Sequence, residues 1–173
     1  MKIELKLIQK EMIRPLFDIK YGEGADLEWL KFNGPYFRDS VPSWLEYQKS
    51  SHTSIENPHR KIILVDNEIK GELSAHWEDG ELQKWLEMGV VIYKCEDWAK
   101  GIATTALREW ILYLFELHAD IEHLAFTTWS GNPGMIKVGE KTGMKAEGVI
   151  RKVRYWNEQY YDSVKFGILR SEV

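Results

Sequence analysis

The spacing of apolar and polar residues changes three times along the chain and predicts a mixed α/β fold. IELKLI (3–8) alternates as a half-buried strand does. Helical spacing and polar loops follow, and alternation returns from residue 61. Beyond Gly101 the spacing becomes helical again, and one apolar stripe predicts the clearest helix of the chain. The stripe consists of Ala103, Ala106, Leu107, Trp110, Ile111, Leu114 and Phe115.

The remaining elements complete the order β–ααα–βββ–α–β–α–ββ, which is that of a mixed α/β domain. Turn signals at Asp66-Asn67 and Asp79-Gly80 make residues 61–93 an antiparallel meander. We predict helices over 10–20, 26–32 and 42–50, the last starting at a proline, strands over 61–66, 68–77, 84–93 and 123–129, a short helix from Pro133 to near Gly143, and a closing hairpin of 146–156 and 160–169.

Composition narrows the class of protein. A chain of 173 residues, 44% hydrophobic, predicts one domain over residues 1–173. The net charge of −4 argues against a nucleic-acid partner. Cys95 is the only cysteine, so no intrachain disulfide forms, which favours a cytoplasmic location. The apolar runs are too short for a signal peptide or a membrane span, so we expect no membrane partner.

The segment DWAKGIATTAL (97–107) joins a strand to the main helix through a bare glycine. Gly101 can serve only to ease a bend. Alternatively, the junction directs free N–H groups and the positive end of the helix dipole at an anion such as a phosphate. It is neither a dinucleotide fingerprint nor a P-loop, because the further glycines and the G-K-[ST] sequence are absent.

Three stretches in order resemble the GNAT acyltransferases. VIYKCEDWAKGIATTAL resembles their acetyl-CoA-binding motif, with Gly101 and Ala103 matching and Trp98 replacing Gln/Arg. SGNPGMIKVGEKTGMKAEG and YYDSVKFGILRSE resemble later segments of the branch of ribosomal-protein N-terminal acetyltransferases. The resemblance covers residues 60–173 well and 1–59 in outline. It implies a GNAT fold: a central, mostly antiparallel sheet of six to seven strands flanked by helices.

The resemblance implies where acetyl-CoA, the co-substrate, would bind. Backbone amides at the glycine junction would hold the pyrophosphate, because a side chain at residue 101 would obstruct it. The pantetheine arm would lie along the preceding strand, whose amide at Val91 would polarise the thioester carbonyl. The implied cofactor-binding residues are Val91, Ile92, Tyr93, Trp98, Ala99, Lys100, Gly101, Ile102, Ala103, Thr104 and Asn132.

The usual general acids are missing. Family members place a tyrosine seven residues after the asparagine, or a serine three residues after it, and here these positions are Gly139 and Met135. Because a thiolate leaves without much help, we expect water to protonate it. Met135→Ser or Gly139→Tyr is then expected to be neutral or to raise kcat.

Glu87 is the leading candidate for the general base, because it begins the strand that would hold the cofactor. Alternatively, it is a strand-end glutamate facing water. His76 is the second candidate, with a structural role as its alternative. The other histidines show no ligand spacing, so we predict no metal, and we expect Cys95 to be packed. The residues that would line the acceptor site, or else pack in the core, are Trp29, Phe32, Tyr36 and Phe37.

We therefore predict an N-acetyltransferase that transfers the acetyl group of acetyl-CoA to a primary amine. A protein or peptide N-terminus is favoured and a small-molecule amine is the other option. A non-catalytic acyl-CoA sensor and an unrelated α/β interaction domain remain as alternatives, and the chain is expected to be a monomer or a homodimer.

Overall fold

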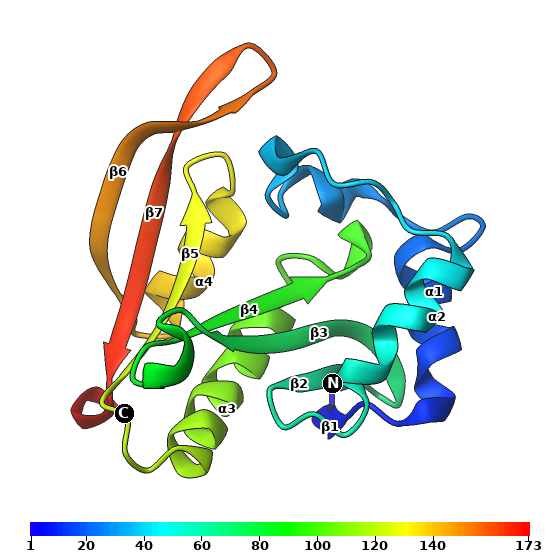
Figure 1. Cartoon of the computed structure of the whole chain (residues 1–173), viewed down its shortest axis with the longest axis horizontal. Helices are drawn as coiled ribbons and strands as arrows, with labels where there is room; N and C mark the ends of the chain where they lie inside the picture. The colour runs from blue at the N-terminus through cyan, green and yellow to red at the C-terminus, as the bar shows by residue number, and fades with distance from the viewer. The chain divides into compact units, whose positions relative to one another are not determined.

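The computed structural model describes residues 1–173 and contains a seven-stranded sheet with helices (Figure 1). The strands run in the order β1-β2-β3-β4-β5-β7-β6, and β4 pairs with β5 in parallel. This confirms the predicted mixed fold and the meander. The elements are β1 (Ile3–Leu7), α1 (Ile13–Tyr21), α2 (Trp44–Ser51), β2 (Arg60–Val65), β3 (Glu68–Trp77), β4 (Leu86–Ile92), α3 (Ile102–Leu117), β5 (His123–Trp129), α4 (Pro133–Lys141), β6 (Lys145–Trp156) and β7 (Gln159–Leu169).

The chain forms two compact units. Unit 1 contains residues 1–74 and 90–102, and unit 2 contains residues 75–89 and 103–173. None of the helices combines the length and the hydropathy that a membrane span requires.

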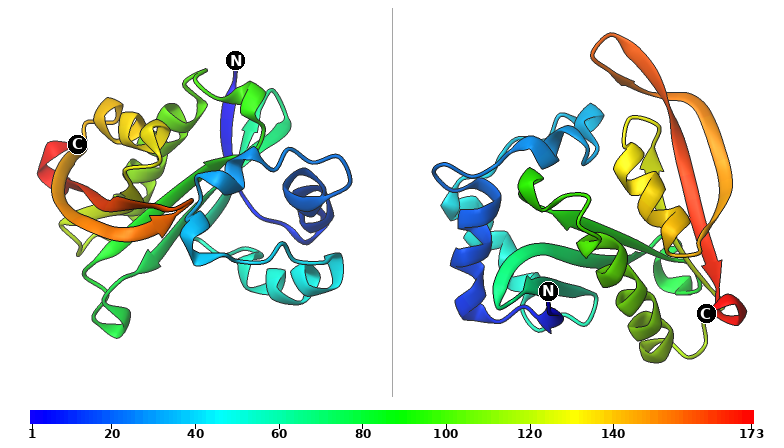
Figure 2. Two further views of the ribbon diagram at one scale, coloured as in Figure 1. Left: turned by 90° about the horizontal axis from the view of Figure 1, so that it is seen from above. Right: turned by 180° about the vertical axis from the view of Figure 1, so that it is seen from behind.

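Unit 1 is built on β1, β2 and β3, which pair antiparallel in that order. Helices α1 and α2 lie side by side (Figures 1 and 2). Phe17 of α1 packs against the rings of Trp44 and Tyr47 of α2 at centroid distances of 5.3 and 5.4 Å. Burial of these large rings contributes to the stability of this unit. The buried core cluster of this unit is Ile8, Ile13, Leu16, Trp29, Ile62, Leu64 and Tyr93.

Unit 2 is built on β5, β7 and β6. Strand β7 pairs antiparallel with the whole length of β5, through its residues 163–169, and with β6 in a long hairpin (Figure 1). The apolar stripe predicted for α3 is confirmed, since Trp110 and Leu114 are fully buried. Helix α4 packs closely on β5 and β7 because Gly139 lies against the stacked rings of Phe126 and Phe166.

Several predicted boundaries differ from the structure. Residues 26–32 do not form an α-helix but one 3-10 turn at Glu28–Lys31. Helix α2 begins at Trp44 and not at the proline, because the Ser43 side chain caps it. Strand β4 begins at Leu86 and not at residue 84, because Asp79 accepts hydrogen bonds from the two preceding N–H groups and holds them in the loop.

Candidate functional site

The glycine junction has the backbone conformation that its sequence predicts. Ala99 and Gly101 have φ angles of +60° and +82°, and α3 begins at Ile102. The first turn of an α-helix leaves its N–H groups without partners inside the helix. A Cβ on Gly101 would meet no atom within 4 Å, so the glycine is required by its positive φ and not by crowding within this chain. The open side of Gly101 fits the close approach of a phosphate.

Side chains on both sides fix the shape of this junction. The indole Nε1 of Trp98 donates to the carbonyl of Ile92 at 2.8 Å, and Phe32 lies edge-on to the Trp98 ring. Asp97 is buried and pairs with Lys70 at 3.3 Å and with Lys100 at 3.2 Å. Burial opposes the ionisation of Asp97, but the two lysines outweigh it and lower its pKa. The ion pair with Asp97 therefore holds the Lys100 side chain against its own loop.

Two of the predicted cofactor-binding strand residues, Val91 and Tyr93, are held tightly in unit 1. A Cβ on Gly71 would lie 2.0 Å from the Val91 carbonyl oxygen, so the backbones of β3 and β4 approach closely there. The Tyr93 N–H group donates to the Lys70 carbonyl at 3.0 Å. The Tyr93 side chain is buried, and its hydroxyl donates to Glu72. Burial and the charge of Glu72 raise its pKa well above the ordinary range, so this hydroxyl is a poor acid.

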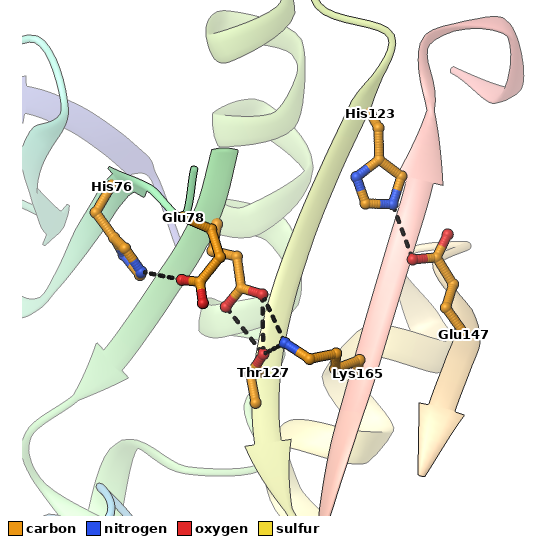
Figure 3. A network of polar contacts seen from close by, with 7 residues as sticks. His76, Glu78, His123, Thr127, Glu147 and Lys165 are labelled. Atoms are coloured by element: carbon orange, nitrogen blue, oxygen red, sulfur yellow. Dashed lines mark hydrogen bonds and ion pairs between the residues drawn. The ribbon is translucent and has the colours of Figure 1, made fainter. Parts of the chain in front are cut away.

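Glu87 does not face water, and that alternative is wrong. Only 5% of the residue is exposed. Thr127 Oγ1 lies 3.0 Å from Oε1 and 2.9 Å from Oε2, and Lys165 Nζ lies 3.1 Å from Oε1. Lys165 also donates to Thr127 Oγ1 at 2.8 Å, which closes a triangle of polar contacts (Figure 3). A buried carboxylate requires such partners because desolvation of a charge is costly.

The second candidate base lies next to the first. Ligand atoms of His76, Glu78 and Glu87 lie within 4.8 Å of one another, and His76 Nε2 is 3.3 Å from Glu78 Oε2 (Figure 3). The His76 and Glu78 side chains are 63% and 41% exposed, so this group connects the buried carboxylate to solvent. Lys165 already supplies a positive charge to Glu87 at 3.1 Å, which disfavours a second cation beside this carboxylate.

Asn132 lies in the turn after β5. Its Oδ1 accepts from the Met135 N–H group at 3.1 Å and caps α4. A Cβ on Gly139 would lie 2.8 Å from Phe126 and 2.9 Å from Phe166. The expectation that Gly139→Tyr is tolerated is therefore wrong, because the ring has no room between α4 and the sheet.

The aromatic residues expected to line an acceptor site have different environments. Trp29 is a core residue, 5% exposed and packed on Tyr93 at 5.2 Å. Phe32 contacts Trp98, and Phe37 is 61% exposed. Cys95 is exposed and not packed as expected. A hydrogen bond to Asp26 raises the pKa of its thiol, which argues against a nucleophile.

Sequence reasoning missed Thr127 and Lys165. Glu87 pairs with Ala125 across β4 and β5, and Thr127 pairs with Lys165 across β5 and β7. Side chains two residues apart on a strand share a face. The three polar residues therefore meet because of sheet register, which the order of the strands along the chain does not reveal.

Comparisons with known proteins agree with this fold. Residues 5–145 match the family model "Acetyltransferase (GNAT) domain". The Bacillus subtilis protein "Putative ribosomal N-acetyltransferase YdaF" is 33% identical over 110 residues, which are 64% of this chain and span 58% of that protein.

Two solved structures share the fold. A GNAT-family acetyltransferase from Bacillus anthracis is 17% identical with a TM-score of 0.78, over 99% of this chain and 97% of that chain. Spermidine N-acetyltransferase from Vibrio cholerae, solved with CoA and spermine, is 18% identical with a TM-score of 0.75, over 98% and 96%. At these identities the likeness concerns the fold alone.

Proposed function

Because the chain belongs to the GNAT acetyltransferase family and is therefore an acyltransferase, we propose that it transfers an acetyl group from acetyl-CoA to the α-amine of a peptide or protein. We also propose that residues 1–173 act as one acetyltransferase domain. The observation that carries the proposal is Glu87, a buried carboxylate held by Thr127 and Lys165 on the strand that leads to the glycine junction.

The proposed cofactor site fits the chain in its backbone geometry. The loop consists of Trp98, Ala99, Lys100 and Gly101, and two positive φ angles shape it. The first N–H groups of α3 follow it, at Ile102, Ala103 and Thr104. Such groups favour an anion because of their orientation and the helix dipole. The proposed contacts to the pantetheine arm are Val91, Ile92, Tyr93 and Asn132.

Acetyl-CoA supplies the acetyl group: a C–N bond to the acceptor forms, the C–S bond breaks, and the electron pair leaves on the thiolate. Glu87 takes the proton of the acceptor ammonium through water, and His76 and Glu78 lie where that proton can pass to solvent. The attacking nitrogen loses a second proton as the amide forms, and water carries this proton to the departing thiolate. Alignment of the two reactants supplies roughly 7–11 kcal/mol of the barrier reduction.

The free-energy cost of deprotonating the acceptor favours an α-amine. Neutralising an α-amine of pKa about 7.7–8.0 costs about 1 kcal/mol at pH 7, whereas a lysine-like amine of pKa about 10.4 costs about 4.6 kcal/mol. A carboxylate that is already ion-paired with Lys165 suits the smaller task. The name of the Bacillus subtilis relative, a ribosomal N-acetyltransferase, agrees with this choice.

The test is thiol release from acetyl-CoA with a panel of acceptors: peptides with free N-termini, polyamines, aminoglycosides and free amino acids. Turnover of α-amines supports the proposal. Turnover of spermidine or a lysine side chain without any α-amine contradicts the acceptor class. Binding of acetyl-CoA without turnover of any acceptor would indicate a sensor.

A further inference from the structure

We propose that Lys165 is the positioning residue for the base: it holds the Glu87 carboxylate in the orientation that accepts the acceptor proton. The inference rests on the proposed function of Glu87. Lys165 itself touches neither reactant in this proposal and acts through Glu87 and Thr127 alone.

The contacts give the two carboxylate oxygens different surroundings. Lys165 Nζ contacts only Oε1, at 3.1 Å, whereas the Thr127 hydroxyl lies 3.0 Å from Oε1 and 2.9 Å from Oε2. A hydroxyl has one hydrogen to donate, and Thr127 Oγ1 also accepts from Lys165 at 2.8 Å. Lys165 therefore orients the Thr127 hydroxyl and binds one carboxylate oxygen, so the other oxygen is the better placed to receive a proton.

The ammonium of Lys165 is itself held from a second side. Its Nζ lies 5.3 Å from the centroid of the Trp85 ring, which precedes β4. A cation over an aromatic face is attracted by the ring quadrupole. The Lys165 side chain is 29% exposed, compared with 7% for Glu87, so the pair lies at the boundary between the interior and solvent.

The register of the sheet makes the arrangement rigid. Lys165 lies directly opposite Thr127, and Thr127 lies two residues beyond Ala125, the partner of Glu87. The three side chains therefore project from three adjacent strands on one face. Sites built on strands hold their geometry better than sites on loops.

The experiment measures kcat/KM across pH 6–9 for Lys165→Met, Lys165→Arg and Glu87→Gln, with the α-amine acceptor that the panel identifies. Without an effective base only the free amine reacts. Relative to wild type, kcat/KM of Lys165→Met should then be about 10²-fold lower near pH 6. This difference should shrink by up to tenfold per pH unit until the pH reaches the acceptor pKa of about 7.7–8.0. Lys165→Arg, which retains the charge, should recover most of the activity.

Lys145→Met is the matched control, because Lys145 is a 72% exposed β6 lysine that pairs with Glu172. It should leave kcat/KM unchanged at every pH. If Lys165→Met does not fold, Lys165→Gln replaces it in the same series.

The outcomes separate the two proposals. A deficit of Lys165→Met that is constant with pH would show a structural role and overturn the inference, provided that Glu87→Gln shows the shrinking deficit. If Glu87→Gln itself shows no pH-dependent deficit, the proposed base is wrong. The same pattern in both variants supports both proposals.

Discussion

Glu72 in unit 1 and Glu87 in unit 2 are both buried glutamates with a lysine partner, but their surroundings differ. Glu72 pairs with Lys20 at 2.8 Å and with Arg60 at 3.1 Å, and it also accepts from the Tyr93 hydroxyl. Lys20 in turn lies over the ring of Tyr47 at 5.2 Å. Arg60 binds one carboxylate oxygen of Glu72, and Lys20 and the Tyr93 hydroxyl bind the other, so neither oxygen is left open to a reactant.

Glu87 has fewer partners than Glu72, and exposed titratable side chains lie beside it. One lysine and one hydroxyl hold it, and the half-exposed His76 and Glu78 lie beside it. Burial alone therefore does not mark a functional carboxylate. The comparison indicates that a fully paired glutamate stabilises the fold, whereas a glutamate paired on one side and open to titratable groups on the other is suited to proton transfer.

The largest effect is expected from Glu72→Gln. The change leaves the buried Lys20 and the partly exposed Arg60 without their counter-charge, so we expect the free energy of unfolding to fall by about 3 kcal/mol. Denaturant unfolding measures this loss. A variant as stable as the wild type but inactive would reverse the roles assigned to the two glutamates.

Acid unfolding provides the next prediction. Burial opposes the ionisation of Glu72, but the charges of Lys20 and Arg60 outweigh it and lower its pKa from 4.5 to about 2. Because the folded-state pKa is depressed, the stabilisation is present above pH 4.5 and is lost as the pH falls towards 2. The wild type should lose roughly 3 kcal/mol over this interval that Glu72→Gln does not lose. Parallel pH–stability curves for the two proteins would contradict the assignment.

Glu87→Gln should lower activity strongly and stability only a little, the opposite of Glu72→Gln. The amide keeps the contact with Thr127, and the partly exposed Lys165 regains water, so we expect a stability loss of only about 1–2 kcal/mol. Loss of the base should lower kcat by about 10²-fold or more near neutral pH. Steady-state kinetics and thermal melting on the same preparation test this pairing. A large melting shift without a kinetic effect would place Glu87 with Glu72 as a structural residue.

The smallest effect is expected from His76→Gln. His76 is 63% exposed, and its contact with Glu78 is a surface ion pair at most. If it only passes protons to solvent, buffer can replace it, and kcat should change less than about threefold in concentrated buffer. A loss comparable with that of Glu87→Gln would make His76 the base.

The sequence predicted the main helix well because the apolar periodicity is strong in α3, where helical spacing defines the buried face. It also identified Gly101, since a strand–glycine–helix junction is local in the chain. The reason for this glycine was only partly anticipated, because the positive φ could not be read from spacing.

Side-chain pairing across distant segments could not be predicted. Glu72 meets Lys20 from a helix 52 residues earlier, and Glu87 meets Lys165 78 residues later. These contacts depend on strand order and register, which periodicity does not specify. The same holds for Gly139, whose small size follows from the distance between α4 and the rings of Phe126 and Phe166.

The most direct test uses one peptide that carries both a free N-terminus and an internal lysine. It is incubated with acetyl-CoA and the protein, and tandem mass spectrometry locates the acetyl group, with Glu87→Gln and a protein-free reaction as controls. The account predicts acetylation of the α-nitrogen, much reduced in the variant. Acetylation of the lysine side chain alone, at equal rates in wild type and variant, would contradict it.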